Sequence, residues 1–63
     1  MNATTTITNS RLIGHAHGHE MHAWDEIEPD GTVRSFEEYP TTCYLPVAGF
    51  TIGLTLVRET TAA

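Results

Sequence analysis

The sequence predicts an all-β fold, a small antiparallel meander of three to five strands. Two turn sequences, Pro29-Asp30-Gly31 and Pro46-Val47-Ala48-Gly49, each separate segments rich in apolar and β-branched residues. A third observation is the alternation of apolar and small or polar residues from Phe50 to Leu56, which is the period of a half-buried strand. These features favour a sheet whose neighbouring strands are joined by hairpins.

The chain has 63 residues and is expected to form one domain over residues 1–63, with frayed ends at residues 1–6 and 60–63. A domain this short buries only about 60% of the surface that its unfolded chain exposes. Its stability is therefore expected to be marginal, and a partner, a metal or self-association is expected to add to it. The hydrophobic content of 40% is too high for a disordered chain.

The segment from Thr4 to Ile13 contains threonine, isoleucine and leucine around a polar pair, Asn9-Ser10. It predicts one further strand, or a short strand followed by a turn.

The first hairpin is predicted to have a three-residue loop, Pro29-Asp30-Gly31, that ends in a bulge at Gly31. Proline suits the second position of a type I turn, and glycine is free to adopt a positive φ at the fourth. The loop sets four cross-strand pairs, which are apolar, ionic, aromatic and histidine–carboxylate: Ile27 with Val33, Glu26 with Arg34, Trp24 with Phe36 and His22 with Glu38. A two-residue loop would instead oppose charged to apolar side chains.

The second hairpin is predicted to turn at residues 46–49. Pro40 is expected to bend or interrupt the strand before this turn, because proline has no amide hydrogen. The register of the hairpin is defined by three pairs: Leu45 with Phe50, Cys43 with Ile52 and, beyond the proline, Glu37 with Arg58.

Charge is distributed unevenly along the chain. All four histidines and seven of the eight acids lie between His15 and Glu38, where Arg34 is the only basic residue besides histidine. The chain contains no lysine and has a formal charge of −5, so nucleic acid and anionic membranes are not expected as direct partners. A solvated acidic surface would explain this pattern most simply.

Segregated negative charge would also steer the protein towards a basic patch, and such patches are most extensive on proteins that handle nucleic acid. We therefore expect a non-enzymatic acidic module that docks on a larger basic protein and inhibits or modulates it. Small acidic inhibitors that phages use against host defence, anti-CRISPR proteins among them, have this general character. The residues expected at the interface are Trp24, as an aromatic anchor, and the acids Asp25, Glu26, Glu28, Asp30, Glu37 and Glu38.

The histidines suggest a second function, because neutral imidazole is the commonest protein ligand for zinc, nickel and copper. The candidate ligands are His15, His17, His19 and His22. An extended strand would place the first three on one face, whereas a helix would align His15, His19 and His22. Two interpretations stay open: a transition-metal site, or an exposed polar loop that uses no metal.

A third function is structural, with the strand from Phe50 to Leu56 added to the sheet edge of another protein. Homo-oligomerisation also stays open. The sequence contains no HExxH motif, and no enzymatic activity is expected of so short a chain, which can scarcely build a pocket alone.

The lone cysteine, Cys43, excludes an internal disulfide and favours a reducing compartment. The first fourteen residues lack the charged and apolar parts of a secretory signal, so we expect a cytoplasmic protein. The most apolar segment, residues 44–57, is shorter than the roughly 20 apolar residues needed to span a bilayer as a helix.

Overall fold

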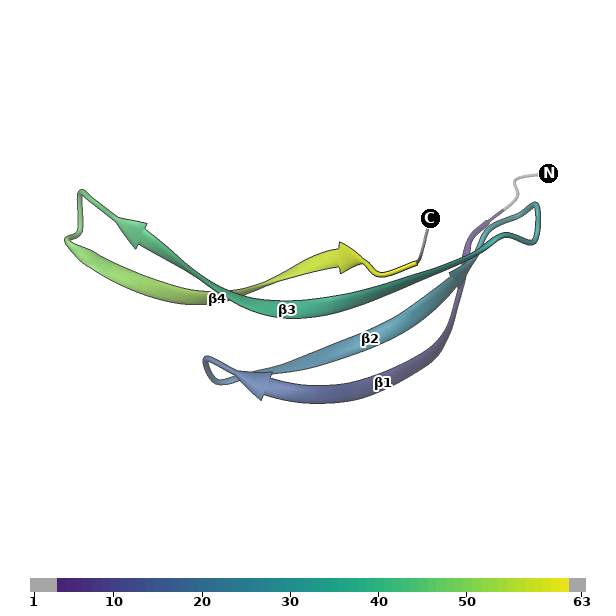
Figure 1. The fold of residues 1–63 in the computed structure, drawn as a ribbon, viewed down its shortest axis with the longest axis horizontal. Helices are drawn as coiled ribbons and strands as arrows, with labels where there is room; N and C mark the ends of the chain where they lie inside the picture. The colour runs from purple at the N-terminus through teal and green to yellow at the C-terminus, as the bar shows by residue number, and fades with distance from the viewer. Residues whose placement is uncertain (1–3, 62–63) are drawn as a thin grey trace.

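A computed structural model describes residues 4–61 as one antiparallel sheet, in which the strand order is β1-β2-β3-β4. The predicted all-β meander is confirmed, with hairpin turns joining consecutive strands. Figure 1 shows an elongated ribbon, whose principal extents are 49 × 25 × 23 Å. None of the described residues belongs to a helix that could cross a membrane. The strands are β1 (Thr6–Ala16), β2 (His19–Ile27), β3 (Val33–Leu45) and β4 (Phe50–Glu59).

The β2–β3 hairpin has the predicted three-residue loop. The amide of Glu28 donates to the carbonyl of Thr32 at 2.8 Å, and Gly31 donates back to Glu28 at 2.9 Å, with Gly31 at φ +92°. Beyond the last backbone pair, His22 and Glu38 are still joined, but through a side chain. The Glu38 carboxylate accepts a hydrogen bond from the backbone amide of His22 at 2.7 Å. The predicted ladder pairs are confirmed: Ile27 with Val33, Glu26 with Arg34 and Trp24 with Phe36.

The β3–β4 hairpin also has the predicted register. Gly49 adopts φ +77° and donates to the carbonyl of Leu45 at 2.7 Å, which closes the turn. The confirmed pairs are Leu45 with Phe50, Cys43 with Ile52 and Glu37 with Arg58.

Pro40 does not interrupt β3, so the expectation of a break or bend in the pairing was wrong. Its partner is Thr55, within a ladder that runs without a register shift. The reason is that backbone groups alternate in direction along an antiparallel strand. Thr32 hydrogen-bonds towards β2, and Pro40 lies eight residues further along, so its nitrogen also faces the β2 side. The β3–β4 ladder therefore needs no amide hydrogen from Pro40.

The two halves of the sheet separate beyond a short shared region. β2 pairs with β3 only over residues 23–27 and 33–37, whereas β3 pairs with β4 along ten residues. Past this region the β1–β2 hairpin leaves the edge of β3 (Figure 1), and its tip comes to lie against β4 at Gly53. Within the described residues, the edge of β2 that faces β3 therefore has no partner strand before residue 23, and the edge of β3 that faces β2 has none after residue 37. We call these the inner edges of β2 and β3.

The predicted N-terminal strand is confirmed as β1, which begins at Thr6 and continues to Ala16. Two register shifts bulge β1 away from β2, one between Thr8 and Arg11 and one between Leu12 and Gly14. Asn9, in the first bulge, has φ +56°. Of the ends that were expected to fray, residues 1–3 and 62–63 lie outside the described part of the chain. The amide of Thr60 donates to the carbonyl of Ser35 at 2.8 Å.

The β1–β2 turn lies inside the histidine cluster, where no turn was predicted. His17 and Gly18 form a two-residue loop with φ values of +53° and +77°. Positive φ at both positions is the requirement of a type I′ turn, which matches the twist of the flanking strands. Histidine is one of the few side chains enriched at positive φ, so the pair His17-Gly18 satisfies this requirement.

The sheet has almost no closed interior. Ala23 is the one buried hydrophobic residue in the described part of the chain, with 3% of its surface exposed. The tip of the β1–β2 hairpin leans on β4, where a Cβ on Gly53 would overlap the imidazole ring of His17. Exposed large apolar side chains lie on all four strands and in one turn: Ile7, Leu12, Ile13, Ile27, Val33, Tyr44, Val47, Phe50, Leu56 and Val57.

Candidate functional site

Four of the predicted acids gather at one end of the molecule, around the β2–β3 turn. We call Asp25, Glu26, Glu28 and Asp30 the acidic end. Successive side chains of a strand point to opposite faces, so Asp25 and Glu26 lie on different faces of β2 while Asp30 lies in the turn. Figure 1 shows this turn at the opposite end of the long axis from the β3–β4 turn. The acids therefore surround a protruding end of the sheet and do not cover one face.

Hydrogen bonds hold two carboxylates of the acidic end in place. Asp25 accepts one bond from the hydroxyl of Ser35 at 2.8 Å and another from the amide side chain of Asn9 at 3.1 Å. Asp30 accepts a bond from the backbone amide of Thr32 at 2.8 Å. These donors stabilise the ionised form and lower the pKa of each carboxyl, that of Asp25 chiefly through Ser35. Both groups are therefore charged at neutral pH.

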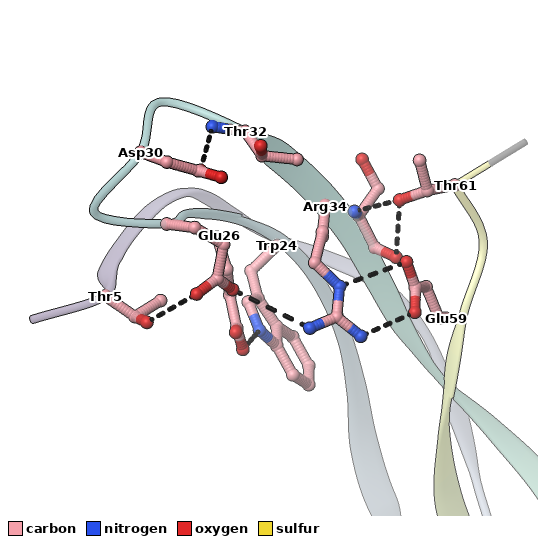
Figure 2. Close-up of polar contacts among 10 residues, drawn as sticks. Thr5, Trp24, Glu26, Asp30, Thr32, Arg34, Glu59 and Thr61 are labelled. Carbon is pink, nitrogen blue, oxygen red and sulfur yellow. Dashed lines mark hydrogen bonds and ion pairs between the residues drawn. The ribbon is translucent and has the colours of Figure 1, made fainter.

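Trp24 lies beside the acidic end but is not a free aromatic anchor. Its ring stacks on Phe36, with the ring centroids 6.0 Å apart, and its indole nitrogen donates to Glu26 at 3.0 Å. The guanidinium of Arg34 lies 5.2 Å from the centroid of Phe36. Figure 2 shows Trp24, Glu26 and Arg34 side by side beneath the turn. The aromatic pair therefore orders the acidic end from one face.

Arg34 is bound by a residue that the sequence argument had not assigned to the site, Glu59 of β4. The guanidinium donates to both carboxylate oxygens, through Nη2 at 2.7 Å and Nε at 3.2 Å (Figure 2). A weaker contact of 3.7 Å joins Arg34 to Glu28. The signal was present in the register, because pairing Glu37 with Arg58 places Glu59 next to Phe36. Arg34 and Glu59 neutralise each other, and with Arg11 acting on Asp25 the four carboxylates of the acidic end keep an excess of negative charge.

Glu37 and Glu38 do not join the acidic end. They point to opposite faces of β3, and each has a partner of its own. Glu37 accepts a hydrogen bond from Nε of Arg58 at 2.9 Å and forms an ion pair with its Nη2 at 2.7 Å, and Arg58 also lies over the ring of Tyr39. Glu38 is 3.4 Å from the imidazole of His22. Of the six predicted interface acids, four are brought together and two are held in separate internal contacts.

The end of the sheet that the β3–β4 turn forms has no charged residue. No acidic, basic or histidine residue occurs between Glu38 and Arg58, a segment that includes the β3–β4 turn and most of β4. The long axis therefore runs from an anionic end to a neutral one.

The histidine cluster is divided by its own turn. His15 and His19 occupy successive registers, opposite Glu20 and Ala16, so their side chains point to opposite faces. The expectation that His15, His17 and His19 share a face was wrong, because the reversal of the chain at His17 interrupts the strand period. Within residues 4–61 no three histidine, cysteine or carboxylate side chains are arranged to hold a metal ion. Metal binding by His15, His17, His19 and His22 stays a prediction.

The described residues enclose no pocket. The chain matches no family model, no curated protein and no solved structure.

Proposed function

We propose that the protein is a non-enzymatic acidic binding module that docks on a larger basic protein and inhibits or modulates it. The observation that supports this proposal is the acidic end, where four carboxylates lie around a protruding turn, Asp30 exposed and the other three half-buried. Of the three arginines, Arg34 is bound to Glu59 and Arg58 to Glu37, while the charge of Arg11 acts on Asp25; the chain has no lysine. An excess of negative charge of this kind accelerates encounter with a cationic surface and disfavours anionic partners.

The target class that fits best is a protein whose basic groove accepts the phosphate backbone of a nucleic acid. Asp25 and Asp30 are held ionised by hydrogen bonds, so their charge is fixed in position before docking. Carboxylates on both faces of a narrow end can meet cations on both walls of a groove. In concrete terms, this is a nucleic-acid mimic of the kind that phages use as anti-defence or anti-CRISPR inhibitors.

The cytoplasm is the compartment that suits this proposal. Cys43 is exposed, and a free exposed thiol persists in a reducing environment.

The proposal is tested by capture of host proteins on the immobilised chain, followed by competition with duplex DNA. Proteins with a high isoelectric point should be retained at low salt and released by the DNA, because both ligands would occupy the same groove. Release of the same proteins by rising salt should follow from electrostatic docking.

The matched variants divide the eight acids of the chain into two sets of four. The first set neutralises the acidic end by Asp25→Asn, Glu26→Gln, Glu28→Gln and Asp30→Asn. The second neutralises the other four acids by Glu20→Gln, Glu37→Gln, Glu38→Gln and Glu59→Gln. Each variant changes the formal charge from −5 to −1. The first should lose capture, whereas the second, which frees Arg34 from Glu59, should weaken capture much less. Equal loss from both, or capture that DNA does not displace, contradicts the proposal.

A further inference from the structure

The sheet has four open strand edges, and three of them carry a feature that prevents pairing with another strand. On the outer edge of β1 there are two bulges and the positive φ of Asn9. Along the inner edge of β2, the amide of His22 is already bonded to the Glu38 carboxylate. The inner edge of β3 contains Pro40, whose nitrogen faces that side. Bulges and prolines are the devices by which natural sheets avoid edge-to-edge association.

The outer edge of β4 is different. The structure describes every residue of β4, and the strand contains no proline, lysine or register shift over its ten residues. Its backbone directions follow from the bond between the amide of Thr60 and the carbonyl of Ser35 in β3. Even-numbered residues bond to β3, so the outward groups belong to Thr51, Gly53, Thr55, Val57 and Glu59. This edge is a regular row of free donors and acceptors.

We propose that a second copy of this chain pairs antiparallel with β4, about a two-fold axis at Leu54, to form a continuous eight-stranded sheet. The backbone geometry restricts the register. Outward-facing residues must pair with outward-facing residues, so the residue numbers of each pair must sum to an even number. A register with an odd sum would also place apolar side chains beside the polar face of the other copy.

The axis at Leu54 gives the best side-chain pairs. On one face Leu54 meets its own copy and Ile52 meets Leu56, while on the other Gly53 meets Thr55 and Thr51 meets Val57. The apolar row of each copy, in which Phe50 and Leu56 are 53% and 45% exposed, is thereby extended by the other. β4 is thus complementary to itself.

The distribution of charge also favours a second copy of this chain as the partner of β4. The chain has a formal charge of −5, so two copies repel one another wherever acids meet. From Phe50 to Val57 β4 has no charged residue. In the proposed register Arg58 lies opposite Phe50 of the second copy, and Glu59 falls beyond the overlap. Self-association at β4 therefore brings no acid opposite another, and it leaves the acidic end free, so it does not depend on the proposed docking function.

Sedimentation of the full chain at increasing concentration tests the dimer. Thr55→Pro removes an outward amide hydrogen and leaves the bonds to β3 in place. Ile7→Pro is the matched control, since Ile7 lies opposite Glu26 and its amide faces outward from β1. The wild-type chain and Ile7→Pro should sediment as dimers at concentrations where Thr55→Pro is monomeric. A wild-type chain that stays monomeric at millimolar concentration, or equal dimerisation of Thr55→Pro, overturns the proposal.

Oxidative crosslinking tests the register and decides the matter alone if Thr55→Pro does not fold. Leu54 would form a pair without mutual hydrogen bonds, with a Cα separation near 4.5 Å, which a disulfide can bridge. In a Cys43→Ser background, Leu54→Cys should give a crosslinked dimer at least tenfold faster than Ile7→Cys, whose side chain is 63% exposed. Equal rates for the two thiols contradict pairing at Leu54.

Discussion

The carboxylates of this protein are held by specific donors. The pKa of Asp25 is lowered by the hydroxyl of Ser35 and the amide of Asn9, and that of Glu59 by its hydrogen bonds to Arg34. A group whose pKa is lower in the folded state stabilises the fold above its unfolded pKa and loses this contribution as the pH falls through the folded value. With ordinary values of 3.8 and 4.5 for Asp25 and Glu59, the contribution is complete at neutral pH and decreases below about pH 4.5.

We therefore predict that the free energy of unfolding falls as the pH is lowered from 5 to 2. The reason is that Asp25 and Glu59, whose ordinary pKa values are 3.8 and 4.5, become protonated in this range. Urea denaturation across this range measures the effect. The double variant Asp25→Asn, Glu59→Gln should show a shallower decrease, because two of the shifted groups no longer titrate. Parallel loss of stability in the wild type and the double variant would show that these two carboxylates do not set the acid sensitivity.

At the scale of the elements, the β1–β2 hairpin is positioned at two places, its short ladder with β3 and the contact of His17 with Gly53. A methyl group on Gly53 would overlap the imidazole ring, so the tip must move away. Gly53→Ala is expected to destabilise the fold by about 1 kcal/mol, which is in the usual range for a surface-proximal substitution that displaces a packed side chain. Thermal unfolding measures this loss.

The control for this prediction is His17→Gly, which removes the ring and accepts the positive φ of the turn. In that background Gly53→Ala should cost nothing, since no ring remains to be displaced. Additive effects of the two substitutions would show that the hairpin tip and β4 are not coupled.

The elements also show which parts of the fold are readable from the chain. The turns at Gly31 and Gly49 were predictable because each combines proline and glycine at positions that a known turn requires, and each fixes a testable register. The His17-Gly18 turn was missed because the histidine segment was interpreted as a metal site or as an exposed polar loop, and neither interpretation places a turn at a particular pair of residues. Pro40 was misjudged although the predicted β2–β3 loop already determines the direction of its nitrogen, because Thr32 bonds towards β2 and Pro40 lies an even number of residues further along β3.

The contacts of the acidic end were predictable as far as the strand register predicts them. Glu26 and Arg34 were expected to pair, and they are cross-strand neighbours, but Arg34 forms its shortest bonds with Glu59. That contact joins residues 25 positions apart and depends on β4 returning beside β3. Glu37 and Glu38 were assigned to the interface from their position in the sequence. Their partners, Arg58 and His22, come from strands on either side of β3 and remove them from the acidic end.

At the scale of the whole molecule, the protein is an open, elongated sheet with an anionic end and a neutral edge strand. Within residues 4–61 one hydrophobic residue is buried and many are exposed, which fits a chain whose stability is completed by association. The two surfaces that we propose are separate, the acidic end for a cationic protein and the β4 edge for a second copy. A dimer formed at β4 would display two acidic ends.

The central claim is that the acidic end selects a cationic partner. Its most direct test is the salt dependence of the dissociation constant between the chain and a captured basic protein, measured for the wild type and the two matched four-acid variants. Neutralising Asp25, Glu26, Glu28 and Asp30 should flatten the plot of log Kd against log salt and weaken binding at low salt at least tenfold. Neutralising Glu20, Glu37, Glu38 and Glu59 frees Arg34 beside the acidic end and should change the slope and the affinity much less. Identical slopes for the two variants would contradict the claim.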